Sequence, residues 1–239
     1  MEERNESELS AYALMELHAE AMFTHDADMR LRMMNEPWPG EAAAPRFFLG
    51  RTTEGRSVWR FRYDVPSEIV QRLESLCTDE PAVSDFETKP KHAEAYMELL
   101  QGERFTMGPC FHIPVETASK MPVVQLTSEN IASHRLDGFE WLAAEIGYVQ
   151  PCMAVVRQSH VASVCRSVRI SPLAHEAGLE TLEPYRGNGY AAAVVAEWAK
   201  GVRARGCVPL YSTSGDNASS QRVAQKLNLS FYGVNFTIY

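Results

Sequence analysis

Hydrophobic residues in the first half of the chain follow a helical pattern, then an alternating one. Over residues 8–23 apolar side chains return every three or four positions, which predicts an amphipathic helix. Residues 47–63 alternate apolar and polar positions around a glycine, which predicts two short strands. Helical spacing returns over 66–77 and 92–100, whereas residues 104–122 are rich in proline and end the first half.

The second half alternates strands and helices more regularly. Its segments follow the order strand, two helices, three strands, helix, strand, helix and strand. Ser128 is a candidate cap for the first helix, and Gly206 is a natural end for the helix that follows residue 190. Pro209 is compatible with an edge strand or with a place where two strands part. The predicted strands are 123–127, 152–158, 160–170, 178–182, 207–213 and 229–239, and the predicted helices include 139–147 and 216–227.

Size and composition indicate a soluble folded protein. With 239 residues, 45% of them hydrophobic and 23% charged, the chain can bury a core in one or two domains. Its acidic start and its lack of a long apolar run predict a cytoplasmic protein that does not enter a membrane. The formal net charge of -8 disfavours a nucleic-acid partner and suits an amine-bearing small molecule.

The cysteines and histidines do not have the spacing of a metal site. The five cysteines are scattered without a CxxC pair, and the seven histidines include no HExxH pattern. We therefore expect reduced thiols in the core and no bound metal.

Residues 185–195, YRGNGYAAAVV, predict a tight turn that leads into a helix. Such a turn brings free backbone N–H groups and the positive end of the helix dipole together, so it can bind a phosphate. Gly187 and Gly189 would let a ligand approach the backbone closely. A G-x-G pair also occurs where glycines only satisfy backbone angles, so the surrounding sequence has to distinguish the two cases.

Two other phosphate-binding patterns do not fit this turn. The P-loop requires a four-residue gap followed by Lys and Ser or Thr, and neither is present. GNGYAA formally meets the dinucleotide pattern G-x-G-x-x-G/A, but the next strand, 207–213, lacks the acidic residue that would hold a ribose. Only residues 190–239 follow Gly189, too few for the rest of a dinucleotide-binding domain.

The hexapeptide RGNGYA resembles the R/Q-x-x-G-x-G/A signature of the GNAT superfamily of acyl-CoA N-acyltransferases, with Arg186, Gly189 and Ala191 at the defined positions. The resemblance covers roughly the second half of the chain and is greatest to a bacterial subgroup with an N-terminal extension. It implies an α/β (α+β) fold with a mixed, mostly antiparallel sheet flanked by helices. Residues 119–239 would form the GNAT N-acetyltransferase domain, and residues 1–118 an N-terminal α+β extension that shapes the acceptor site.

The resemblance also implies that the chain binds acetyl-CoA as co-substrate. Backbone N–H groups of the turn would surround the coenzyme pyrophosphate, while strand residues before the turn would hydrogen-bond the pantetheine arm. Asn217 matches a family asparagine that contacts this arm, but it is equally explained as a helix cap, and both roles can hold. The residues predicted at the cofactor site are Thr181, Leu182, Arg186, Gly187, Asn188, Gly189, Tyr190, Ala191, Asn217 and Ser220.

Acyl transfer from a thioester to an amine needs a base for the amine and a proton for the leaving thiolate. Glu180 is the predicted catalytic base because it lies on the strand before the turn; a solvated strand residue is the alternative. Glu176 and His175 are weaker candidates, which we expect on the surface.

The usual general acid of the family is missing from this sequence. Many relatives have a tyrosine seven residues after the asparagine, where this chain has Ala224. Tyr211 and Tyr232 could replace it, although each also fits a core aromatic whose hydroxyl has a partner. A thiolate with a pKa of about 8.5 can leave with little help, so the loss does not exclude catalysis.

The sequence therefore predicts an N-acetyltransferase that moves an acetyl group from acetyl-CoA to a primary amine of a small molecule. We expect direct attack without a covalent enzyme intermediate, because no cysteine has a histidine next to it in the sequence. The main alternative, suggested by Ala224, is a non-catalytic acyl-CoA-binding regulatory domain. A structural module with an empty turn is the third possibility.

Overall fold

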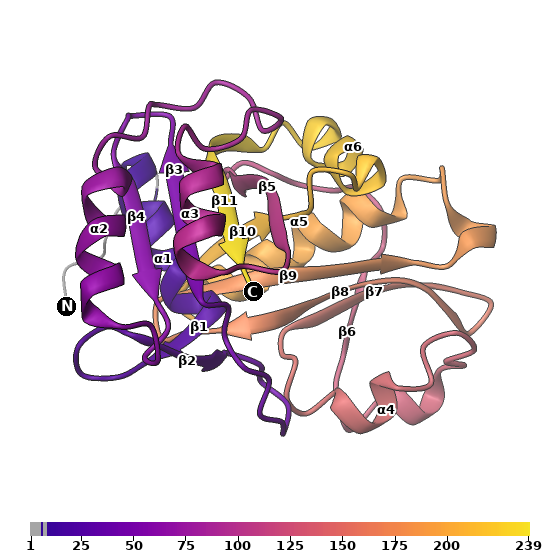
Figure 1. The fold of residues 1–239 in the computed structure, drawn as a ribbon. Coiled ribbons are helices and arrows are strands. Elements are labelled where there is room, and N and C mark those ends of the chain that lie inside the picture. Colours follow the sequence, from indigo (N-terminus) through magenta and orange to yellow (C-terminus); the bar gives the residue numbers. More distant parts are fainter. Residues whose placement is uncertain (1–5, 7–8) are drawn as a thin grey trace.

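The computed structural model describes residue 6 and residues 9–239, in which helices cover both faces of one large sheet (Figure 1). The helices are α1 (Ala11–Met22), α2 (Ser67–Cys77), α3 (Ala93–Leu100), α4 (Leu142–Glu145), α5 (Tyr190–Arg203) and α6 (Ala218–Lys226), with 3₁₀ turns at Ile131–Ser133 and Glu183–Tyr185. The strands are β1 (Phe23–His25), β2 (Leu31–Met34), β3 (Phe47–Thr52), β4 (Ser57–Phe61), β5 (Phe105–His112), β6 (Val124–Leu126), β7 (Cys152–Arg157), β8 (His160–Ile170), β9 (Ala174–Thr181), β10 (Val208–Ser212) and β11 (Ser230–Ile238).

Within the described residues, nine strands form the large sheet in the order β4-β3-β11-β5-β10-β9-β8-β7-β6, and β1 and β2 form a separate pair. All pairs in the large sheet are antiparallel except β9 and β10. The predicted mixed, mostly antiparallel sheet is therefore confirmed. The C-terminal strand β11 lies between β3 and β5, so both halves of the chain contribute to one sheet, and the division at residue 118 stays a prediction.

The first part of the proline-rich segment 104–122, where no strand was predicted, forms the central strand β5. Pro109 is tolerated there because its carbonyl accepts a hydrogen bond from Thr213, on the side where β10 has already ended. A residue in a strand directs its N–H and C=O to the same neighbour, so the missing N–H does not interrupt the ladder with β11.

The two faces of the sheet carry different helices. Leu210 packs in the cluster beneath α1, whereas its neighbour Tyr211 packs in the cluster beneath α5, as expected when successive side chains point to opposite faces. Phe47 and Leu49 of β3 pack with α2 and α3, and Phe48 packs with α1. The sheet therefore has α1 on one face and α2, α3 and α5 on the other (Figure 1).

Most predicted element ends are confirmed, with two corrections. Gly206 ends the α5 region at a φ of +76°, as predicted. At the start of α1, Ser10 caps the helix by accepting the N–H of Ala13. Ser128 caps no helix, because the chain there forms only the short 3₁₀ turn that follows Asn130. The helix predicted over 139–147 is regular only in the four residues of α4.

Candidate functional site

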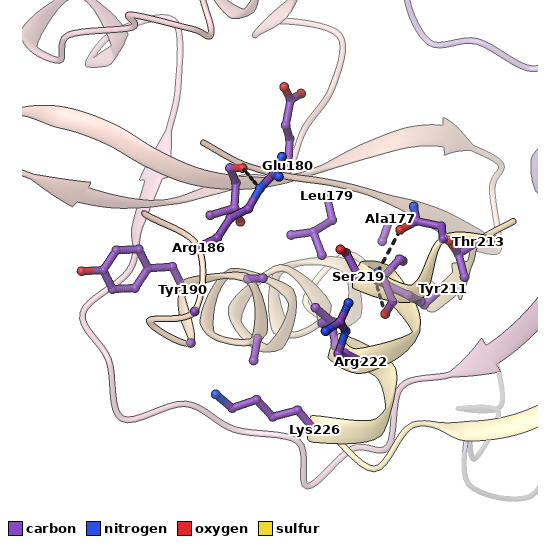
Figure 2. A pocket seen from close by; sticks show the side chains of 18 of the residues that line it. Ala177, Leu179, Glu180, Arg186, Tyr190, Tyr211, Thr213, Ser219, Arg222 and Lys226 are labelled. Atoms are coloured by element: carbon purple, nitrogen blue, oxygen red, sulfur yellow. Dashed lines mark hydrogen bonds between the residues drawn. The ribbon is translucent and has the colours of Figure 1, made fainter. Parts of the chain in front are cut away.

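A cleft opens where β9 and β10 part. The two strands pair in parallel from Val208 to Leu210, opposite Ala174 to Glu176, and β9 then continues to Thr181 without this partner. The resulting cleft has a volume of about 750 Å³ and lies between β9, the start of α5 and α6 (Figure 2). Pro209 lies in the part of β10 that is still paired with β9, so neither an edge strand nor the parting of β9 and β10 accounts for it. The N–H of Val208 donates to Leu173 O on the β9 side, so position 209 faces the β5 side, where pairing begins only at Leu210.

The glycine turn forms the open end of the cleft. Gly187 and Gly189 have φ angles of +82° and +79°, a conformation that glycine adopts at little cost. Gly189 is the residue before α5, and within the described chain no side chain caps this helix. The first N–H groups of α5 are therefore available, together with the positive end of the helix dipole, for an anion. A Cβ at Gly187 would meet no atom within 4 Å, so the space in front of this residue is open.

Three cationic side chains surround this end of the cleft: Arg186 from the turn, and Arg222 and Lys226 from α6 (Figure 2). Nε of Arg186 donates to Thr181 O at 3.3 Å, which holds the guanidinium against the end of β9. A Cβ on Gly189 would come within 3.0 Å of Lys226 Nζ, so this amine lies directly over the turn. The anion site is thus locally basic in a protein with a net charge of -8.

Sequence reasoning missed Arg222 and Lys226. They are four residues apart and therefore share one face of α6, and this spacing was visible in the sequence. What the sequence did not give is the direction of α6, which turns this face toward the glycine turn.

Most residues predicted at the site line the cleft. Leu182 and Asn188 do not. The N–H of Leu182 donates to Ala162 O of β8 and its carbonyl accepts from Tyr185, so its backbone is already occupied, contrary to the prediction. Asn188 donates to the carbonyls of Tyr185 and Arg186 and so stabilises the turn from outside. The predicted residues that line the cleft are Glu180, Thr181, Arg186, Gly187, Gly189, Tyr190, Ala191, Asn217 and Ser220.

The α6 side of the cleft is fixed by two hydrogen bonds. Asn217 caps the helix by accepting the N–H of Ser220 at 3.1 Å, so the capping role is confirmed. The Ser220 hydroxyl lies 2.6 Å from the hydroxyl of Tyr211, a buried residue that also borders the cleft. Burial raises the pKa of Tyr211 to about 12, although the hydrogen bond to Ser220 lowers it. Tyr211 is therefore a poor proton donor near neutral pH.

The other candidate acids are buried. Ala224 packs in the core beneath α5 with Trp198, so the family tyrosine position holds only a methyl group. Tyr232 is 3% exposed and packs in the cluster beneath α1, where its hydroxyl has no hydrogen-bond partner within the described residues. Burial raises its pKa well above the usual value.

Glu180 is exposed and lies near the end of β9, at the border of the cleft. Its carboxylate points away from α5 and α6, whereas Ala177 and Leu179 point toward them (Figure 2). Glu180 therefore faces the side of the sheet that carries α1. The expectation that His175 and Glu176 lie on the surface is wrong: their exposed fractions are 4% and 2%.

The cysteines and other groups add no further site. All five cysteines are unpaired and buried, as expected for core thiols. Cys110 lies 3.9 Å from His18 Nε2, a proximity that the sequence does not show, but it is completely buried. Among the residues described here, no group of three or more His, Cys, Asp or Glu side chains is placed to hold a metal ion. None of the helices in the same part of the chain has the length and apolar character needed to cross a bilayer.

A parallel strand pair that opens onto the uncapped start of a helix defines an α/β protein that can hold an extended, phosphate-bearing ligand. Residues 144–239 match the model of the GNAT acetyltransferase family, a segment that contains β7 to β11 and the cleft. This match assigns residues 144–239 to the GNAT acetyltransferase family.

Solved structures of low sequence identity resemble the chain. They include a GNAT-family protein from Novosphingobium aromaticivorans, 20% identical over 57% of this chain and 65% of that chain, with a TM-score of 0.47. An acetyltransferase of the GNAT family from Colwellia psychrerythraea is 13% identical over 80% and 81% of the two chains, with a TM-score of 0.48. A GCN5-related N-acetyltransferase-like protein from Streptococcus suis is 14% identical over 82% and 85%, with a TM-score of 0.46. The chain thus spans slightly less than two thirds of the first of these proteins, and no curated protein matches it.

Proposed function

We propose that this protein is an N-acetyltransferase that transfers an acetyl group from acetyl-CoA to a primary amine of a small molecule by direct attack. One observation carries the proposal: β9 and β10 part after Glu176 and Leu210, and the gap leads to the uncapped start of α5. The match of residues 144–239 to the GNAT acetyltransferase family supports the same reaction class.

The residues at the cleft fit acetyl-CoA. The first N–H groups of α5 and the cations Arg186, Arg222 and Lys226 would hold its phosphates. Since the N–H of Leu182 points to β8, the N–H groups of Thr181 and Leu179 point to the gap and would bind the pantetheine amides. When bound, acetyl-CoA supplies the acetyl group as a thioester open to attack.

The proposed base is Glu180. Its exposed carboxylate borders the cleft and can exchange a proton with an amine directly or through water. Direct attack is supported by the burial of all five cysteines, because none is accessible as a nucleophile. The net charge of -8 supports a cationic amine as the acceptor.

The second candidate function is a non-catalytic acyl-CoA-binding regulatory domain. Two observations favour it: Ala224 offers no acid, and the hydroxyl of Tyr211 is bonded to Ser220 with its pKa raised to about 12. The leaving thiolate would then have to be protonated by solvent.

The deciding experiment measures acetyl-CoA binding by calorimetry and free-thiol release with a panel of amines. Binding together with amine-dependent release supports the acetyltransferase. Binding without release on any amine supports the regulatory domain. If acetyl-CoA neither binds nor raises the melting temperature, the cleft has another use.

A further inference from the structure

The end of the cleft at which β9 and β10 part carries a hydrogen-bonded series of polar side chains from four elements. Ser212, the last residue of β10, lines the cleft and donates through Oγ to Glu176 Oε2 at 3.1 Å. Glu176 is the β9 residue at which pairing with β10 ends. Its other oxygen accepts from Nδ1 of His18, which comes from α1. His18 Nε2 in turn lies 3.2 Å from the side-chain amide of Asn235.

These hydrogen-bonded polar side chains are costly to bury. His18 is completely buried and Glu176 is 2% exposed, so both have lost their contact with water. Apolar residues of similar size in the same place would stabilise the fold equally well or better. Buried ionisable pairs next to a cleft are typical of functional sites, because they fix the orientation of a group that meets the ligand.

The hydrogen bond to Glu176 determines how the Ser212 hydroxyl is oriented at the cleft. A carboxylate only accepts hydrogen bonds, so the single hydrogen of the Ser212 hydroxyl points to Glu176. The remaining lone pairs of Ser212 Oγ are then available to a donor in the cleft. Burial alone would lower the pKa of His18, but its contacts with Cys110 and Glu176 raise this pKa well above the usual value.

Ser212 also lies on the correct face of the sheet. Tyr211 points toward α5, so Ser212 points to the opposite face, as Glu176 does. Glu180 faces the same side from β9 (Figure 2). Ser212 and Glu180 therefore border the gap on the same face of the sheet, and an acceptor bound on this face could contact both.

We propose that Ser212 accepts a hydrogen bond from the attacking amine, that Glu176 and His18 orient its hydroxyl for this purpose, and that the contact favours primary over secondary amines. The inference rests on the proposed acetyltransferase function. A neutral primary amine has two N–H groups, one for the base and one for Ser212. A secondary amine has a single N–H and must give up one of these contacts. Ser212 is thus an amine-contacting residue, and Glu176 and His18 are positioning residues.

The test compares phenethylamine with N-methylphenethylamine as acceptors for the wild-type protein and for Ser212→Ala, Ser212→Thr and Ser214→Ala. We expect the preference in kcat/KM for the primary amine to fall about tenfold in Ser212→Ala, the value of one hydrogen bond of this kind. Ser212→Thr keeps a hydroxyl and should retain the preference. Ser214→Ala is the control, because Ser214 is exposed and lies just beyond β10.

Glu176→Gln provides a second variant that leaves Ser212 in place. A glutamine amide can donate to Ser212 Oγ and turn its hydrogen toward the cleft, so this variant should lose the same preference. Calorimetry of phenethylamine binding to the CoA-bound protein gives a readout without turnover: affinity should fall about tenfold in Ser212→Ala and Glu176→Gln, while CoA affinity is unchanged.

The outcomes separate this inference from the function on which it rests. Amine acetylation by the wild type with an unchanged preference in Ser212→Ala would overturn the role of Ser212 and leave the acetyltransferase function intact. Bound acetyl-CoA with no turnover of any amine would overturn both.

Discussion

Glu180 tests the proposed chemistry at the scale of one residue. It borders the cleft, is exposed and lies on the same face of the sheet as Ser212. We expect Glu180→Gln to lower kcat by about a hundredfold, the usual contribution of a general base, with acetyl-CoA affinity nearly unchanged. The measurements are free-thiol release across pH and calorimetry.

Glu183→Gln is the matched control for this variant. Glu183 is also exposed and lies three residues further along, in the 3₁₀ turn outside the cleft lining. A wild-type rate for Glu180→Gln at every pH would exclude Glu180 as the base.

Residues of the turn were predictable from the sequence because their roles are local. Gly187 and Gly189 adopt positive φ angles within the turn, and Asn217 caps the helix that it precedes. The hydrogen bonds that link Ser212, Glu176 and His18 were not predictable. His18 and Glu176 are 158 positions apart, and only the packing of α1 on β9 brings them together.

At the scale of elements, the turn and the start of α5 form one proposed anion site. Gly187→Trp should fill the open space in front of the turn and raise the dissociation constant of acetyl-CoA on the order of a hundredfold, through loss of two or more charge-assisted hydrogen bonds. Calorimetry measures this change.

Gly206→Trp is the control for backbone strain. Gly206 lies at the other end of α5, has a φ of +76° and, like Gly187, has no atom within 4 Å of an added Cβ. Both variants should lose a similar amount of stability, whereas only Gly187→Trp should lose affinity for acetyl-CoA. Equal affinities in the two variants would remove the turn from the binding site.

The positive face of α6 leads to a separate expectation. Lys226→Ala should weaken acetyl-CoA binding about fivefold to tenfold at low salt, because its amine lies over the turn, and this difference should shrink as salt increases. Lys200→Ala is the control, since Lys200 pairs with Glu197 on α5 and does not line the cleft. A salt-independent effect of Lys226→Ala would contradict a contact with phosphate.

Elements with a clear period were predictable, and elements defined by distant partners were not. The alternation of β8 and the helical spacing of α5 are properties of the local sequence. β5 contains Gly108 and Pro109, which disfavour a strand in isolation. It forms because β10 and β11, which lie more than 90 positions further along the chain, pair with it on its two sides.

At the scale of the whole molecule, the first half of the chain is part of the site and of the sheet. β5 separates β10 from β11, and α1 packs across β3, β9 and β11 on the face where Glu180 and Ser212 lie. Through His18, α1 also holds Glu176 at the point where the strands part. Removal of the first half would therefore disrupt the cleft rather than only expose it, and experiments on this protein need the complete chain.

The buried histidines predict a stability maximum for the whole molecule. His18 has a raised pKa in the fold, so its contribution is fully present below the unfolded pKa near 6.5 and is lost as pH rises above it. His175 has the opposite shift: burial and Arg205 lower its pKa to about 4, so its contribution is present above 6.5 and is lost as pH falls toward 4. Burial also lowers the pKa of His25. The free energy of unfolding should therefore be greatest near pH 6.5.

Denaturant unfolding at intervals from pH 5 to pH 8.5 measures this profile. We expect a decrease of about 1–2 kcal/mol on each side of the maximum, since a one-proton difference between the folded and unfolded states changes the free energy by about 1.4 kcal/mol per pH unit. The double variant His18→Gln/Glu176→Gln should flatten only the alkaline side, and His175→Gln should flatten mainly the acid side. An alkaline slope that persists in the double variant would show that the contact between α1 and β9 does not carry this proton, and the raised pKa of His18 would have to be abandoned.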